Sequence, residues 1–169
     1  MNVYLAVLLL AGGALLQSSL YPYLTIIGVR PGIVLPMVVS WSIIKGASAG
    51  VTWGLIGGLA LDLFSGAPLG VSALALTAVG FATNLGESKL FKSTLVLPLI
   101  AVFLASLAYD TMHVLLLQAL GWDLPLVEAV TRIAVPTAIL NTIVMPVIYL
   151  GLQWIARRSN RVRELELEW

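Results

Sequence analysis

Long unbroken apolar runs are the feature of this 169-residue chain that most limits how it can fold. Hydrophobic residues make up 60% of the sequence and charged residues only 10%, whereas soluble domains carry about 25% charged residues. A water-soluble fold of this size leaves roughly 30% of its unfolded chain's surface exposed, so it could not hide this much apolar surface. We therefore expect the chain to fold in lipid.

The apolar runs predict an all-α, polytopic integral membrane protein with six transmembrane helices. Each crossing needs about 20 apolar residues, and the runs lack the alternating polarity of barrel strands. The second span ends at residue 44 and begins either after a connection at 21–32 or before Arg30. The expected spans are 3–20, the second span to 44, 46–64, 69–85, 94–120 and 127–155. They form a transmembrane domain at 1–156 and a cytoplasmic polar tail at 157–169, which leaves no room for a soluble catalytic or nucleotide-binding domain.

The charges predict the orientation. Nine Lys and Arg residues oppose eight Asp and Glu residues, a balance that does not indicate a nucleic-acid partner. With the N-terminus in the cytoplasm, only Arg30 and Arg132 face outward. The other basic residues face the cytoplasm: Lys45, Lys89, Lys92, Arg157, Arg158, Arg161 and Arg163. The positive-inside rule therefore places both termini in the cytoplasm.

Four arginines follow the last span closely. Arg157, Arg158, Arg161 and Arg163 would lie beside the cytoplasmic membrane face, where anionic lipid attracts basic side chains by about 1 kcal/mol each. We expect this basic tail to face lipid, and docking of a cytoplasmic partner is the alternative.

The third span carries small residues at every fourth position. Gly46, Gly50, Gly54 and Gly58 are followed at the same interval by Asp62. Glycines at this spacing let another helix backbone approach closely, which promotes helix association in lipid. The stripe predicts packing against a neighbouring helix of the same chain, or an interface with a partner protein or a second copy.

Ionisable residues at membrane depth predict a polar cluster. Asp62, Asp110, His113 and Arg132 are expected near the outer leaflet, with Arg132 in ion-pair reach of Asp110 or Asp62, because buried charges in lipid survive by pairing. Two alternatives stay open: Asp62 caps the turn that follows its helix, and Glu128, four residues before Arg132, competes for the guanidinium. The cluster would serve as a structural or gating network, or as a ligand-binding or proton-coupled site.

The sequence does not favour catalysis. It contains one histidine and no cysteine, which leaves a zinc site short of its usual ligands. No serine lies in a nucleophile-elbow context. We expect no catalytic residues, no metal and no cofactor.

Residues 54–70 carry a recognisable motif, in which a glycine-rich helix ends in Asp62 and a small turn leads to Pro68-Leu69-Gly70. This stretch resembles the signature of the rod shape-determining protein MreD family. Chain length, the number of expected spans, Arg30-Pro31 and the short tail also fit that family.

The resemblance implies a non-enzymatic component of the bacterial elongation complex in the inner membrane, supporting cell shape and peptidoglycan synthesis. Its implied direct partner is an MreC-like single-span protein. RodA, a class B penicillin-binding protein and MreB filaments would be indirect partners. The family is similar in fold to the S components of energy-coupling-factor transporters, which implies an S-component-like bundle. A vitamin-binding S component is therefore the alternative function.

Overall fold

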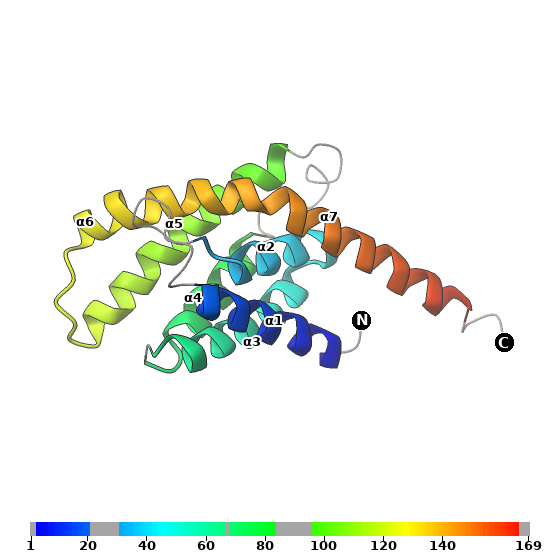
Figure 1. The fold of residues 1–169 in the computed structure, drawn as a ribbon, viewed down its shortest axis with the longest axis horizontal. Coiled ribbons are helices and arrows are strands. Elements are labelled where there is room, and N and C mark those ends of the chain that lie inside the picture. The colour runs from blue at the N-terminus through cyan, green and yellow to red at the C-terminus, as the bar shows by residue number, and fades with distance from the viewer. Residues whose placement is uncertain (1–2, 21–30, 67, 84–95, 166–169) are drawn as a thin grey trace.

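The computed structural model describes residues 3–20, 31–66, 68–83 and 96–165, and these residues form helices and short connections without a strand (Figure 1). The helices are α1 (Val3–Leu20), α2 (Val34–Lys45), α3 (Ala47–Ser65), α4 (Val71–Ala82), α5 (Val96–Ala119), α6 (Leu126–Ala129) and α7 (Val135–Leu165), with a π-helical turn, η2 (Val130–Ala134), before α7. The all-α expectation is confirmed for the described chain.

In the described ranges, three helical segments are long and apolar enough to cross a membrane: Ala47–Ser65, Pro98–Ala119 and Leu126–Arg158. The described parts of the other expected spans are shorter apolar helices. Helices α2 and α4 have 12 residues each, or about 18 Å at 1.5 Å per residue, against a hydrocarbon core of about 30 Å. Six complete crossings therefore stay a prediction.

Helix α2 is the centre of the bundle. Its residues 34–43 are all buried, and it contacts α1, α3, α4, α5 and α7. A helix that is apolar on nearly every side is typical of a protein core or a membrane span, and α2 is enclosed by other helices. Trp41 of α2 stacks on Trp53 of α3 with ring centroids 4.6 Å apart, and both rings are buried.

The outer surface is apolar. Leu8, Leu63, Leu74, Leu104 and Val147 lie on five different helices and are all exposed. A soluble monomer rarely exposes large contiguous apolar areas. The exposed side chains therefore fit a membrane-integral protein whose surface contacts lipid.

Close packing joins α3 to α4 along a line of three glycines, Gly50, Gly54 and Gly58, which we call the glycine seam. A Cβ atom built on Gly54 would lie 2.5 Å from the carbonyl oxygen of Leu76, and one on Gly58 would collide with the backbone of Ala73. Only glycine allows this approach. The seam therefore serves packing within the chain, the first of the two alternatives for the stripe.

Gly80 completes the contact from the α4 side. A Cβ atom on Gly80 would lie 2.5 Å from the carbonyl oxygen of Gly50, and the hydroxyl of Ser42 donates a 2.7 Å hydrogen bond to the Gly80 carbonyl. Gly46, by contrast, does not belong to the seam. It connects α2 to α3 with a φ of 102°, a conformation that favours glycine.

Two prolines shape the last helix. Pro136 cannot donate to the carbonyl of Arg132, and its ring would clash there, which accounts for the wider η2 turn directly before it. Pro146 lies inside α7, and the helix changes direction along its length (Figure 1). The helix continues to Leu165, so the first part of the expected tail prolongs α7 beyond the bundle.

Replacing a seam glycine should loosen the α3–α4 contact. We expect Gly54→Leu to lower the free energy of unfolding by about 1–3 kcal/mol or more, because leucine must displace the α4 backbone. Thermal unfolding in detergent measures the effect. Gly151→Leu is the matched control, since a Cβ atom there meets nothing within 4 Å. Equal melting of the two variants would contradict the seam.

Candidate functional site

Asp62 closes the glycine seam and caps the start of α4. Its side chain is 2% exposed. Oδ2 accepts hydrogen bonds from the main-chain N–H groups of Gly70 at 2.8 Å and Ala73 at 3.3 Å, and Oδ1 accepts one from Ser72 at 2.9 Å. A helix N-terminus carries unpaired N–H groups and a partial positive charge, and a carboxylate satisfies both. The capping alternative for Asp62 is thus the one observed, with α4 as the helix capped.

The geometry also explains the Pro68-Leu69-Gly70 turn. Gly70 precedes α4 with a φ of 102°, a left-handed conformation that directs its N–H to Asp62. The N–H of Val71 bonds to the carbonyl of Pro68. Leu69 projects outward and is exposed. The carboxylate, the glycine and the turn therefore act together to begin α4.

The backbone N–H groups at the start of α2 are also hydrogen-bonded by side chains, which come from α1 and α7. Gln17 Oε1 accepts hydrogen bonds from the N–H groups of Ile33 and Val34 at 2.8 and 3.2 Å. Asn141 Oδ1 accepts one from Gly32 at 2.7 Å, while its Nδ2 donates to Ser106 Oγ at 3.0 Å. Gln17 and Asn141 were not among the residues predicted from the sequence, although single amides within apolar runs are a signal of such roles.

A cavity of about 920 Å³ lies at the end of the bundle where α1, α3 and α5 end and α4 begins. We call it the polar cavity. Its lining residues are Gln17, Ser18, Leu61, Phe64, Ser65, Ser72, Tyr109, Asp110, His113, Val114, Leu117, Leu124, Pro125, Glu128, Ala129, Arg132 and Ile133. Three members of the expected cluster, Asp110, His113 and Arg132, therefore share one cavity. Asp62 lies behind the wall, bonded to Ser72.

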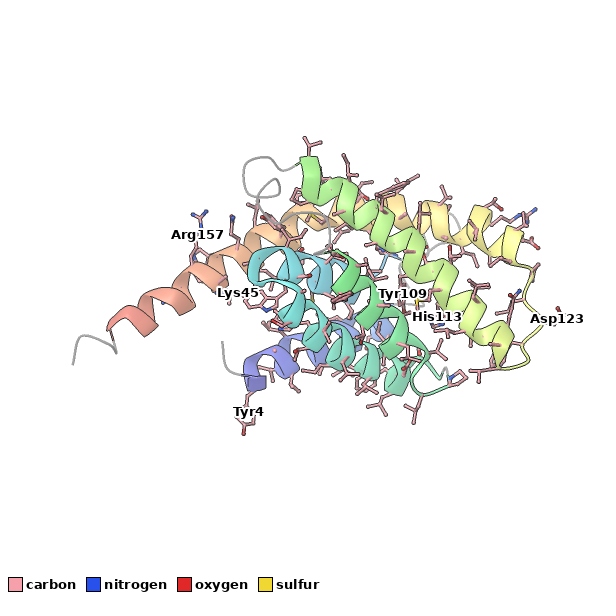
Figure 2. The ribbon with its side chains drawn as sticks, turned by 180° about the vertical axis from the view of Figure 1, so that it is seen from behind. Tyr4, Lys45, Tyr109, His113, Asp123 and Arg157 are labelled. Atoms are coloured by element: carbon pink, nitrogen blue, oxygen red, sulfur yellow. The ribbon has the colours of Figure 1, made fainter. Side chains whose placement is uncertain are left out.

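Asp110 and His113 come from the same face of α5, one turn apart. His113 also lies beside Tyr109, with ring centroids 5.7 Å apart (Figure 2). Oδ2 of Asp110 and Nδ1 of His113 are buried and have no hydrogen-bond partner among the residues that the structure describes. Nearby, Gln118 ends α5 by donating from Nε2 to the carbonyl of Leu124 at 2.6 Å.

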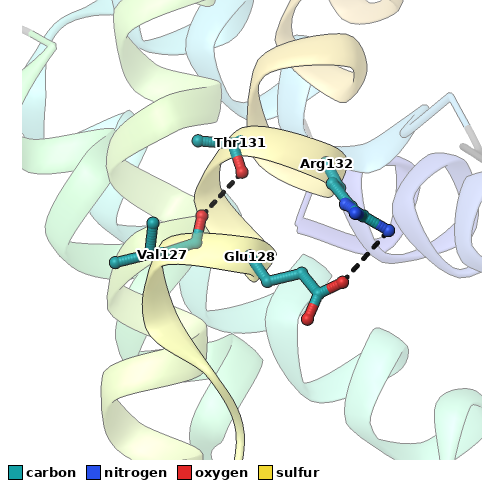
Figure 3. A network of polar contacts seen from close by, with 4 residues as sticks. All are labelled: Val127, Glu128, Thr131 and Arg132. Atoms are coloured by element: carbon teal, nitrogen blue, oxygen red, sulfur yellow. Dashed lines mark hydrogen bonds and ion pairs between the residues drawn. The ribbon is translucent and has the colours of Figure 1, made fainter.

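The predicted ion pair between Arg132 and either aspartate is wrong. Arg132 Nη1 lies 3.2 Å from Oε1 of Glu128, and both side chains are exposed (Figure 3). The two residues are four apart on the continuous α6–η2 helix, so they meet without help from another element. Asp62 is instead satisfied by α4 backbone groups. The competing pair with Glu128 is therefore the one formed.

The basic tail is described in part. Arg157 and Arg158 are exposed on α7, and the Arg158 guanidinium lies 5.2 Å from the ring centroid of Trp154. The side chains of Arg161 and Arg163 lie outside the described residues, as do Arg30, Lys89 and Lys92. In the described part of the chain, no group of three His, Asp or Glu side chains could hold a metal ion.

Removing the Asp62 charge should destabilise the bundle. Asp62→Asn replaces an acceptor oxygen by a donor facing backbone N–H groups, so we expect a loss of about 1–3 kcal/mol in unfolding free energy. The control is Asp123→Asn in the exposed connection before α6. Thermal unfolding in detergent compares the two. If Asp62→Asn melted like the control, the cap would not contribute as described.

A double-mutant cycle tests whether Arg132 acts independently of Asp110. We expect the effects of Asp110→Asn and Arg132→Gln to add within about 0.5 kcal/mol, because Arg132 pairs with Glu128 and not with Asp110. The matched cycle on Glu128→Gln and Arg132→Gln should give about 0.2–1 kcal/mol of coupling, typical of an exposed pair. Stronger coupling in the first cycle than in the second would show that Arg132 does pair with Asp110, against the structure.

Comparison with known proteins gives one family. The model of the family described as rod shape-determining protein MreD matches residues 1–158. Searches of curated proteins and of solved structures returned no match. These comparisons therefore do not support the S-component alternative, and the S-component-like bundle stays a prediction.

Proposed function

We propose, since the chain belongs to the rod shape-determining protein MreD family, that it works as a non-enzymatic scaffold of the cell-elongation complex in the bacterial inner membrane. The observation that carries this proposal is the family match over residues 1–158, almost the whole chain. The apolar outer surface fits a protein that works within the membrane. Membership of the family makes it a rod shape-determining membrane protein. The particular complex and partners are our proposal.

We further propose that both termini face the cytoplasm. Lys45 and Arg157 lie toward one end of the molecule and Asp123 lies at the opposite end (Figure 2). Tyr4, near the start of α1, is on the same side as the two basic residues. Basic residues concentrate on the cytoplasmic side of membrane proteins. This separation supports an orientation in which the polar cavity opens toward the periplasm.

Single cysteines report the orientation directly, because the natural chain has none. We expect Ser65→Cys, at the end of α3, to react with a membrane-impermeant maleimide in intact spheroplasts. Arg158→Cys should react only after the membrane is permeabilised. Labelling of Arg158→Cys but not Ser65→Cys in intact spheroplasts would reverse the orientation.

The proposed direct partner is an MreC-like single-span protein. Lipid-exposed apolar faces on α1, α5 and α7 could pack against a partner helix, because association in lipid depends on close side-chain contact. RodA, the class B penicillin-binding protein and MreB filaments would join through that partner. The basic residues Arg157 and Arg158 are available to anionic lipid at the cytoplasmic surface.

Cell shape and co-purification test this function together. We expect cells that lack the gene to lose their rod shape and to recover it when the chain is expressed. A tagged chain should retain the host's MreC-like protein in mild detergent, while an unrelated single-span protein of equal expression should not be retained. Rod-shaped cells without the gene, or no retention of the MreC-like protein by a fully active chain, would contradict the proposal.

A further inference from the structure

In the described part of the chain, the polar cavity contains hydrogen-bonding capacity that is not used. Oδ2 of Asp110 and Nδ1 of His113 are buried and have no partner among these residues. The α1 side chains of the wall differ, because Gln17 Oε1 accepts from the start of α2 and the Ser18 hydroxyl donates to the Phe64 carbonyl. Leaving a buried polar atom unpaired costs about 1–3 kcal/mol, and more when the group is charged. A ligand that supplied donors to both α5 side chains would recover this cost.

The charged residues of the cavity indicate whether such a ligand carries a positive or a negative charge. Among the described lining residues, Asp110 and Glu128 supply two carboxylates and Arg132 supplies one guanidinium. Arg132 and Glu128 pair with each other in an exposed position, so no basic side chain among the described lining residues pairs with the Asp110 carboxylate. An anionic group would be repelled by Asp110, whereas a cation would be attracted to it.

The volume and the lining of the cavity indicate the size and polarity of the remainder of the ligand. Its volume of about 920 Å³ lies within the range of roughly 300–1,000 Å³ of small-molecule sites. Leu61, Phe64, Val114, Leu117 and Ile133 supply apolar wall beside the α5 polar pair. The fitting ligand therefore combines a cationic head with an apolar body.

We propose that the polar cavity binds a primary ammonium group carried on an apolar body, with Asp110 and His113 as the residues that hold the head. A primary ammonium has three N–H donors, enough for the Asp110 carboxylate and for the acceptor nitrogen of a neutral His113 ring at once. A quaternary ammonium of the same charge has none. This inference does not depend on the proposed role in cell elongation.

Two probes of equal charge separate hydrogen bonding from simple attraction. The purified full chain in a non-ionic detergent is titrated with octylammonium chloride and, separately, with octyltrimethylammonium chloride. Binding is followed by calorimetry and by the rise in melting temperature. We expect octylammonium to bind at least about tenfold more tightly, the usual gain from a hydrogen bond to a charged group. Equal binding of the two probes would overturn the proposal.

Variants locate the site. Asp110→Asn, which keeps the side-chain shape, should weaken octylammonium binding at least about tenfold. Glu128→Gln is the matched control at the exposed ion pair and should change binding less than about threefold, because exposed charges contribute little. Melting of each ligand-free variant establishes that it is folded. If a folded Asp110→Asn variant bound as tightly as the natural chain, the assignment to Asp110 would be wrong.

The same head group occurs on soluble amines and on phosphatidylethanolamine. Native mass spectrometry after reconstitution with phosphatidylethanolamine or with phosphatidylcholine distinguishes these sources. Retention of phosphatidylethanolamine that Asp110→Asn abolishes identifies a lipid ligand. Binding of octylammonium without that retention identifies a soluble amine. Retention of phosphatidylcholine at the same level, insensitive to Asp110→Asn, would contradict the selection of N–H donors.

Discussion

The carboxylate of Asp62 at the start of α4 is the contact on which this arrangement depends. An unpaired backbone N–H group in a low-dielectric interior is expensive, and α4 begins with several of them. The glycine seam brings α4 close enough for one side chain of α3 to reach three of these groups. Seam and cap are thus two parts of one contact: the first sets the helix separation, and the second sets where α4 begins.

The same principle governs the start of α2. Gln17 from α1 and Asn141 from α7 reach the N–H groups of residues 32–34 and tie three helices to one point. The N-termini of both short helices, α2 and α4, are therefore capped by side chains of other helices. The polar cavity lies at this end of the bundle, so the residues that build the fold also form part of its wall.

The sequence predicted well those features that depend on residues close together along the chain. The four-residue repeat identified the close-packed face of α3 and placed Asp62 at its end, and the apolar runs predicted the all-α class. The repeat could not show that Gly80 lies on the other side, because helix pairing is a tertiary property. The predicted ion pair of Arg132 with an aspartate was wrong, because Glu128 lies one helical turn away and reaches Arg132 without any tertiary contact. Residue depth predicted that Asp110, His113 and Arg132 lie near one another, and all three line the polar cavity.

Amide hydrogen exchange over residues 70–73 of the purified chain tests the central contact most directly. These are the first backbone groups of α4, and three of them bond to Asp62. We expect slow exchange there, comparable to that of the middle of α4. Exchange as fast as in an unstructured peptide, with the middle of α4 still protected, would show that the carboxylate does not hold the start of this helix.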